Sequence, residues 1–70
     1  MANLDKMRER IKETIKHSGI SQTQLAKMLL VSPSCIAHYV KGDILPSIDK
    51  LADLCLILEV NPSYLLGLED

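Results

Sequence analysis

From Gly19 to Gly42 the sequence is GISQTQLAKMLLVSPSCIAHYVKG, and it contains two helix-start signals in close succession. Ser21 and Gln24 have the spacing of a capping box, in which each side chain accepts a hydrogen bond from the backbone N–H of the other residue. Ser32 is a second N-cap residue, and Pro33 follows it at the first helical position, where its missing N–H is harmless. Two apolar pairs are spaced to form hydrophobic staples over these starts: Ile20 with Leu25, and Val31 with Ile36. The stretch therefore predicts two short helices joined by a sharp corner.

A corner of this kind is the geometry of a helix-turn-helix, in which one helix braces against a DNA duplex and the next lies in the major groove. Apolar residues at helical spacing and further capping residues predict more helices on both sides of it. The predicted helices cover residues 3–17, 22–29, 33–40 and 48–58, and a last short helix starts at Asn61 and Pro62 and closes at Gly67. Five helices in 70 residues leave no room for a sheet. We therefore expect an all-α, compact five-helix bundle that forms a single domain over residues 1–70.

The composition fits a small helical core with little net charge. Apolar residues make up 47% of the chain and aromatic residues only 3%, so aliphatic side chains must fill the interior. The net charge at pH 7 is −1, which predicts weak non-specific binding to nucleic acid because phosphate neutralisation supplies most of that affinity. Residues 1–28 carry six Lys or Arg and three acids, whereas residues 29–70 carry two and six. The acidic half is expected to face away from a polyanion.

No segment has the features of a membrane span or an export signal. The longest apolar run, Leu54–Leu58, is far too short to cross a bilayer, and the first residues lack the apolar core of a signal peptide. We expect a cytoplasmic protein with no membrane partner. Cys35 and Cys55 lie among apolar residues of predicted helices, so reduced, packed thiols are expected. Cys35 and His38 are one helical turn apart, but no second pair of ligands accompanies them, and we expect no metal site.

The whole pattern resembles the Cro/C1-type (XRE) helix-turn-helix family of phage repressors and bacterial transcriptional regulators. The resemblance covers residues 8–67 and is carried by Gly-Ile-Ser-Gln, Leu-Ala, Val-Ser, Pro-Ser-Ile and Val-Asn-Pro-Ser-Tyr-Leu-Leu-Gly, in that order. It implies a lambda-repressor-like bundle that binds operator DNA, usually as a homodimer.

Four positions depart from the family pattern. Ile15 and Val40 stand where the family often has an Arg–Glu pair, and well-packed apolar residues can replace such a pair without loss of stability. Leu30 and Glu59 stand where the family prefers glycine. A left-handed backbone at these two residues would cost about 1 kcal/mol each. The backbone at position 30 is therefore expected to affect the angle between the helices predicted over residues 22–29 and 33–40.

The helix predicted over residues 33–40 has an apolar face and a polar face. Ile36, Tyr39 and Val40 share helical spacing and are predicted to point into the core. On the opposite face a hydroxyl group can exchange hydrogen bonds with a base edge, a methyl group can contact the methyl of thymine, and an imidazole can donate to a purine N7 or to a phosphate.

This face, together with the start of the preceding helix, provides the predicted DNA contacts. The resemblance implies base contacts at Pro33, Ser34 and His38 and a phosphate contact at Gln22. The side chains predicted to contact base edges are Pro33, Ser34, Ala37 and His38, and those predicted to contact phosphates are Gln22, Thr23, Gln24 and Lys41.

The helix predicted over residues 48–58 holds more apolar residues than one face can cover. Its inward set is predicted to be Ile48, Leu51, Leu54, Cys55 and Leu58, which leaves the two residues after Cys55 toward the flank or solvent. An exposed apolar pair in a small protein favours self-association about a two-fold axis. The predicted homodimer interface consists of Leu56, Ile57, Tyr64, Leu65 and Leu68.

Two functions from different classes fit these observations. The first is a sequence-specific DNA-binding transcriptional regulator, a small repressor that binds a palindromic operator as a homodimer and occludes a promoter. The second is a protein-interaction module, antitoxin-like or partner-binding, that keeps the fold but has little DNA affinity. The neutral charge and the exposed apolar pair favour this second hypothesis. An enzyme is not expected, because the sequence has no glycine-rich phosphate loop. No cofactor and no small-molecule substrate are expected.

Overall fold

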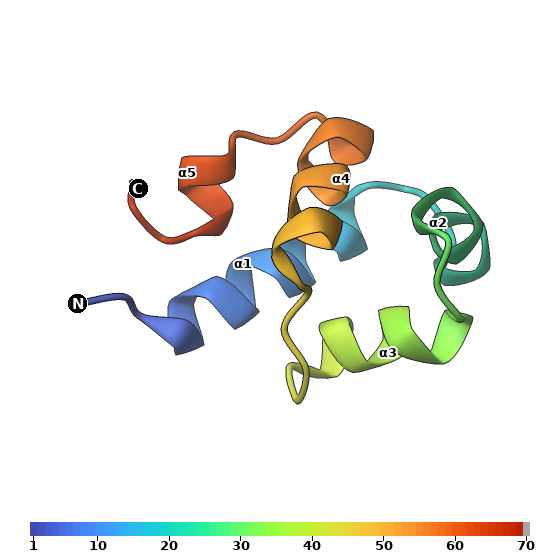
Figure 1. The fold of residues 1–70 in the computed structure, drawn as a ribbon, viewed down its shortest axis with the longest axis horizontal. Helices are drawn as coiled ribbons and strands as arrows, with labels where there is room; N and C mark the ends of the chain where they lie inside the picture. The colour runs from blue at the N-terminus through green and yellow to red at the C-terminus, as the bar shows by residue number, and fades with distance from the viewer. Residues whose placement is uncertain (70) are drawn as a thin grey trace.

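The structure is a computed structural model that describes residues 1–69, and within this range it contains five helices and no strand (Figure 1). Their bounds are α1 Leu4–His17, α2 Gln22–Leu29, α3 Pro33–Lys41, α4 Ile48–Leu58 and α5 Pro62–Leu65. The all-α five-helix bundle is confirmed, and α3 extends one residue beyond its predicted end. Helices α1, α2, α3 and α5 begin after a residue whose side chain accepts a hydrogen bond from the first turn, whereas Ser47, before α4, makes no such bond.

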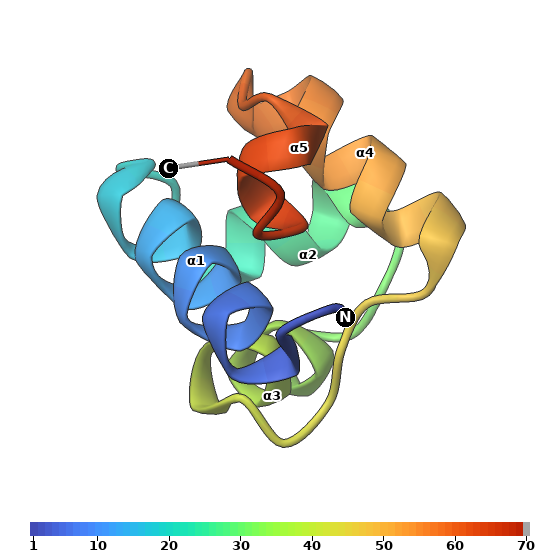
Figure 2. The same cartoon turned by 90° about the vertical axis from the view of Figure 1, so that its left-hand side faces the viewer.

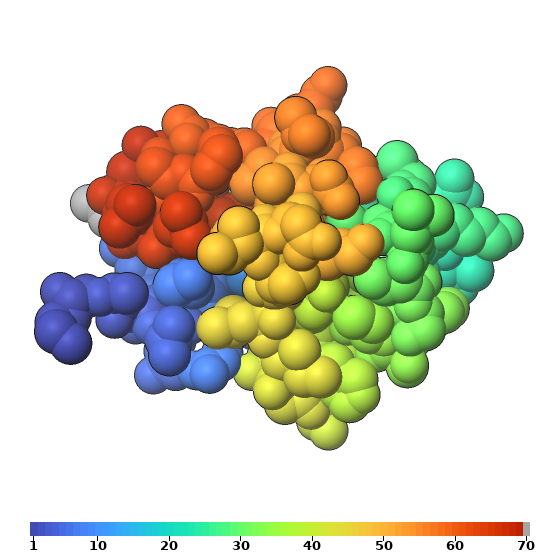
Figure 3. All heavy atoms as spheres, in the orientation of Figure 1, coloured from blue at the N-terminus to red at the C-terminus, as the bar shows by residue number. Residues whose placement is uncertain are grey.

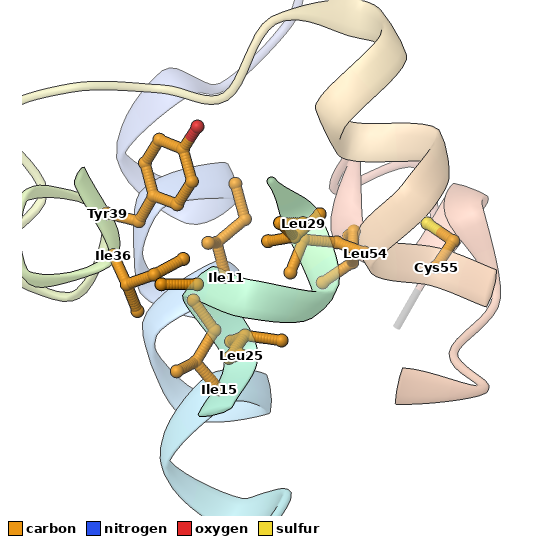
Figure 4. Packing of buried hydrophobic residues seen from close by; sticks show 10 residues of the cluster. Ile11, Ile15, Leu25, Leu29, Ile36, Tyr39, Leu54 and Cys55 are labelled. Carbon is orange, nitrogen blue, oxygen red and sulfur yellow. The ribbon is translucent and has the colours of Figure 1, made fainter. Parts of the chain in front are cut away.

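One core holds the helices together. Helix α1 packs on α3 and α5, and α2 packs on α3 and α4. Figure 4 shows the side chains of these helices pointing toward one another around Leu25, which is fully buried. The buried residues are Ile11, Ile15, Leu25, Ala26, Leu29, Ile36, Tyr39, Leu54, Cys55 and Leu65. In Figures 1 and 2 α3 lies on the opposite side of the molecule from α4 and α5, so the core leaves the outer side of α3 uncovered.

The corner between α2 and α3 is built by a residue with left-handed backbone. Leu30 has φ 60 and ψ 43, and the next N–H, of Val31, donates to the carbonyl of Ala26 at 3.0 Å. This is the hydrogen-bond pattern that ends many helices at a glycine. The Ser32 hydroxyl then accepts from the Cys35 N–H at 3.2 Å and starts α3. The predicted cap is confirmed, and the chain turns sharply over two residues.

The corner between α4 and α5 repeats this construction. Glu59 has φ 55, the Val60 N–H donates to the Cys55 carbonyl at 3.1 Å, and the Asn61 side chain accepts from the Ser63 N–H at 3.0 Å. The two corners share the sequence order of a left-handed residue, Val, a cap residue, Pro and Ser. Both positions where the family prefers glycine therefore adopt the glycine-like backbone in spite of their side chains.

Arg10 attaches the C-terminal segment to α1. Its Nη1 donates to the Tyr64 carbonyl at 2.8 Å and also to the Glu69 carbonyl, and its guanidinium lies 4.2 Å from the centre of the Tyr64 ring. A guanidinium over an aromatic face is attracted to the ring. The short α5 is thus held by a charged side chain as well as by the burial of Leu65.

Helix α4 differs from the prediction in its exposed face. Ile48, predicted to belong to the inward set, has a side chain that is 89% exposed, because it lies on the outer side of α4. Leu56 is 77% exposed, as predicted, whereas Ile57 is half-buried and packs against the core. Ile48, Ala52 and Leu56 follow one another at four-residue steps and are all exposed, so they form an apolar ridge on the outer side of α4. In Figure 3 α4 lies at the surface of the molecule.

Because Leu30 is 86% exposed and has φ 60, its side chain adds strain without filling the core. A left-handed backbone disfavours any residue that has a Cβ. We expect Leu30→Gly to raise the free energy of unfolding by up to about 1 kcal/mol, part of the relieved strain being offset by the freer unfolded chain. Urea denaturation measures this change.

Ala52→Gly is the matched control, because Ala52 is exposed within a regular helix. There, glycine is expected to lower the free energy of unfolding by about 1 kcal/mol. A loss of stability in Leu30→Gly equal to that in Ala52→Gly would contradict the assignment of strain to Leu30.

Candidate nucleic-acid interface

Helix α3 is fixed to the core by one face and exposes the other. Ile36 and Tyr39 are buried, and Val40 is half-buried against the core, which confirms the predicted inward set. Pro33 and Ala37, predicted to contact bases, are exposed. The remaining predicted residues of the outer face are Ser34 and Lys41, which are exposed, and His38, which is half-exposed. One helix face therefore presents a hydroxyl, a methyl group, an imidazole and an ammonium group.

The hydroxyl of Ser34 is connected to the cap of its own helix. Its Oγ lies 3.0 Å from the Ser32 Oγ, and either hydroxyl can donate. The Ser32 hydroxyl also accepts from the Cys35 N–H. Because a hydroxyl group has one donor and two acceptor positions, Ser34 keeps hydrogen-bonding capacity for a base edge.

The start of α2 presents a row of polar side chains to solvent. Gln22, Thr23 and Gln24 are all exposed. The Ser21 Oγ accepts from the Gln24 N–H at 3.1 Å, which is one half of the predicted capping box. These side chains occupy the first turn of α2, where the unsatisfied backbone N–H groups of a helix favour anions such as phosphate.

His38 has an acidic neighbour that the sequence reasoning did not include. Its Nδ1 lies 3.0 Å and 3.1 Å from the two carboxylate oxygens of Asp43. The same carboxylate lies 3.9 Å from the Nζ of Lys41. Gly42, at φ 90, turns the chain after α3 so that Asp43 returns beside the helix. The sequence signal was the glycine that ends the helix, followed directly by an acid.

Helix α1 contributes charge near the end of α3. The aliphatic carbons of Arg8 lie 3.8 Å from the position that a Cβ on Gly42 would occupy, and the Arg8 guanidinium pairs with Asp5 at 3.2 Å. Two further acids of α1, Glu9 and Glu13, pair with basic side chains of the same helix. Near the end of α3, Lys41 and Arg8 thus each have an acidic partner, which limits the local positive potential.

Tyr39 anchors α3 and is the most strongly perturbed titratable group near this face. Burial, together with a hydrogen bond to the Cys35 side chain, raises the pKa of Tyr39 from 10.0 to about 12. Cys35 is half-buried and Cys55 is buried, and both are free thiols, as predicted. Within residues 1–69 there is no group of three metal-ligating side chains and no pocket.

The homodimer residues predicted from sequence are not all available at the surface. Leu65 is 1% exposed and belongs to the core, so it offers no side chain to a partner. Tyr64 is half-buried under Arg10, whereas Leu68 is 71% exposed. Leu56 and Leu68 are the exposed members of the predicted set, and the prediction of an interface now depends on them.

Comparisons with known proteins agree with this geometry. A family model described as a helix-turn-helix domain matches residues 8–70. The solution structure of the SOS-response transcriptional repressor LexA from Eubacterium rectale is similar to this chain, with a TM-score of 0.80 and 28% sequence identity. The similarity covers 96% of this chain and 69% of that chain. No curated protein matches the chain in sequence. No helix within residues 1–69 is long and apolar enough to span a membrane.

The raised pKa of Tyr39 makes stability depend on alkaline pH. The folded state holds this proton more tightly than the unfolded state, so the stabilisation is complete below about pH 10 and is lost as the pH rises toward about 12. Tyr39→Phe has no phenol proton to lose. We therefore expect its free energy of unfolding to fall less between about pH 9 and pH 12 than that of the wild type.

Tyr64→Phe serves as the control in the same urea titration, since it removes the other tyrosine of the chain and leaves the thiols unchanged. It is expected to retain the steep alkaline decline. If Tyr39→Phe and the wild type lost stability in parallel, the decline would have to come from other groups.

Proposed function

The chain belongs to the helix-turn-helix domain family, and we propose that it is a sequence-specific DNA-binding transcriptional regulator, a small repressor that binds a palindromic operator. The observation that carries this proposal is the outer face of α3, which projects its polar side chains away from the core on a helix whose start and end are both fixed. The repressor named among the comparisons is similar over 96% of this chain, which supports the same assignment. Such a protein regulates by occupying a promoter, without catalysis, a cofactor or a small-molecule substrate.

In this proposal α3 lies in the major groove and α2 crosses the DNA backbone. Pro33, Ser34, Ala37 and His38 contact base edges, where hydrogen-bonding and apolar groups distinguish base pairs. Gln22, Thr23, Gln24 and Lys41 contact phosphates, which position the protein without selecting a sequence.

The charge of the protein determines how much phosphate contacts and base contacts each contribute to the affinity for DNA. The net charge is −1, and Lys41 has Asp43 beside it. Non-specific binding depends on the number of phosphates neutralised. A protein with so few unpaired cations at its DNA-facing side gains most of its affinity from the fit of α3 to the groove and from base contacts. We expect weak binding to random duplexes and a shallow dependence on salt.

We also propose that the regulator is a homodimer, because one α3 contacts too few base pairs for a specific site. Leu56 and Leu68 are the exposed apolar residues that support an interface at the end of α4 and near α5, with Ile57 and Tyr64 at its margin. A second copy seated at α4 and α5 leaves α3 uncovered, since these elements lie on opposite sides of the molecule (Figure 2).

A specific observation favours the second candidate function, a protein-interaction module. The apolar ridge of Ile48, Ala52 and Leu56 runs along the outer side of α4, and Asp49 lies beside it. A hydrogen bond from the Ser47 hydroxyl lowers the pKa of Asp49, so this carboxylate stays charged. An apolar ridge with an ionised flank is a surface to which a protein can bind.

Selection from a pool of random duplexes at low salt separates the two candidates. The DNA-binding proposal expects the purified protein to enrich a symmetric site whose halves lie about one helical turn apart. A pool without an enriched site, even at low salt where phosphate contacts are strongest, would favour the interaction module.

His38→Ala and Ser34→Ala are each expected to weaken binding to the selected site by about 1 to 3 kcal/mol and to relax the preference at one position of each half-site. Lys41→Ala is the contrasting variant, because loss of a phosphate contact weakens all duplexes alike and lowers the salt slope by about one. Fluorescence anisotropy with matched and mutated duplexes measures both effects. Unchanged affinity in both His38→Ala and Ser34→Ala would mean that α3 does not contact the bases as proposed.

Leu56→Glu is expected to shift the protein from dimer to monomer, because the charge would be buried at the proposed interface. Ile48→Glu makes the same substitution at the other exposed end of the ridge and is expected to leave the dimer intact. Sedimentation at several concentrations measures the dimer, and thermal melting confirms that each variant is folded. A wild type that is monomeric at high concentration would refute the homodimer, and dissociation by both variants would place the interface along the whole ridge.

A further inference from the structure

The strongest unassigned interaction at the proposed DNA-contacting face is the one between His38 and Asp43. Both carboxylate oxygens of Asp43 lie within 3.1 Å of the same ring nitrogen, Nδ1. The two side chains are 45% and 44% exposed, so the pair lies at the surface and part of the ring remains accessible. An ionised carboxylate only accepts hydrogen bonds. The Nδ1 of His38 must therefore carry a hydrogen and donate it to the Asp43 carboxylate.

This contact determines the tautomer of the imidazole. A neutral imidazole has one N–H, and when that hydrogen is on Nδ1 the other nitrogen, Nε2, is an acceptor. In the absence of a partner, the two tautomers interchange and Nε2 can act either as donor or as acceptor. Asp43 therefore restricts the half-exposed neutral ring to one hydrogen-bonding role.

We propose that Asp43 is a specificity-determining residue, which holds His38 so that its Nε2 accepts a hydrogen bond from the amino group of a DNA base. This inference rests on the proposed function. In the major groove the amino donors are N6 of adenine and N4 of cytosine, whereas guanine offers only acceptors, O6 and N7. The neutral ring thus favours adenine or cytosine at the position that it contacts. The role is opposite to the donor role that the sequence alone suggested for His38.

Protonation reverses this preference. An imidazolium carries hydrogens on both nitrogens, so Nε2 becomes a donor while Nδ1 keeps its contact with Asp43. The preferred partners then become guanine O6 and purine N7. The base preference at one position of each half-site is expected to change with pH.

The other charged groups near the pair lie on α1, on α2 and on the same segment as Asp43. Lys41 lies beside Asp43 on the same segment, and from α1 Arg8 approaches Gly42 and pairs with Asp5. The single charged residue of α2 is Lys27, in its last turn. Carboxylates, lysine and arginine keep their charge between about pH 5.5 and pH 8. The second histidine, His17, lies at the end of α1 beside Glu13, and a His17→Ala variant controls for it.

The test is selection from a random duplex pool at about pH 8 and about pH 5.5, where imidazoles are mainly neutral and mainly protonated. Wild type is expected to favour adenine or cytosine over guanine about tenfold at one position of each half-site at the higher pH, and guanine over cytosine at the lower pH. Asp43→Ala is expected to reduce that preference to less than about twofold at the higher pH, because both tautomers are then populated, while the other positions keep theirs. The matched control, Asp53→Ala, removes the same carboxylate from α4 and is expected to select as the wild type does.

A measurement without DNA tests the tautomer directly. The nitrogen chemical shifts of the His38 ring in the free protein at about pH 8 are expected to show the hydrogen on Nδ1 in the wild type and a mixture in Asp43→Ala. Thermal melting establishes that both variants are folded.

Each remaining outcome is decisive. An enriched site whose preferences are the same in Asp43→Ala and the wild type would overturn the role of Asp43 while leaving the DNA-binding function intact. A wild-type ring with its hydrogen on Nε2 would overturn it as well. If the wild type enriches no site at either pH, the proposed function fails and the specificity assignment fails with it.

Discussion

The left-handed backbone at Leu30 is the constraint on which the rest of the structure depends. It ends α2 and reverses the chain over two residues, so that the Val31 N–H is satisfied by Ala26 and α3 starts at once under its own cap. Only with this change of direction can Leu25 of α2 and Ile36 of α3 meet in one core. The same corner sets which side of α3 remains in solvent. The strain at one exposed residue is therefore linked to the position of the whole candidate interface.

The parts of this fold that depend on local interactions were predicted from the sequence. A cap such as Ser32 acts on an N–H three residues away, and a helical face repeats every few residues, so both are visible in a short stretch of chain. The exposure of Ile48 was not predictable in this way. Its spacing three residues before Leu51 predicted the inner side, but it also lies four residues before Ala52, and the packing of α4 leaves that row of side chains in solvent. Leu65 was misplaced for the converse reason, since α1 covers the short α5 through contacts distant in sequence.

In the candidate site, too, some features could be predicted from the local sequence and others could not. The outward side chains of α3 follow from the buried positions of Ile36 and Tyr39, because two fixed points define the rotation of a helix. Asp43 was missed, since it lies beyond the end of the helix and no periodicity includes it. Its return to His38 depends on the backbone of Gly42, at φ 90, which a glycine permits but does not require. Residue types alone therefore suggested a donor at position 38, whereas the neighbour across the turn makes it an acceptor.

The pairing of cations with acids around α3 has a consequence for selectivity. Each acid near a cation that is proposed to contact DNA, such as Asp43 beside Lys41, reduces the attraction to every phosphate alike and so weakens binding to all sequences. Base contacts are short-ranged and are affected much less by a neighbouring charge. A regulator competes for its site against a large excess of other sequences, so what matters is the ratio of specific to non-specific affinity. An acid that weakens the general attraction while fixing the hydrogen-bonding role of a base-contacting side chain raises this ratio in two ways. Asp43 combines both effects in one carboxylate, which makes an acidic residue at a DNA-binding face consistent with the proposed function.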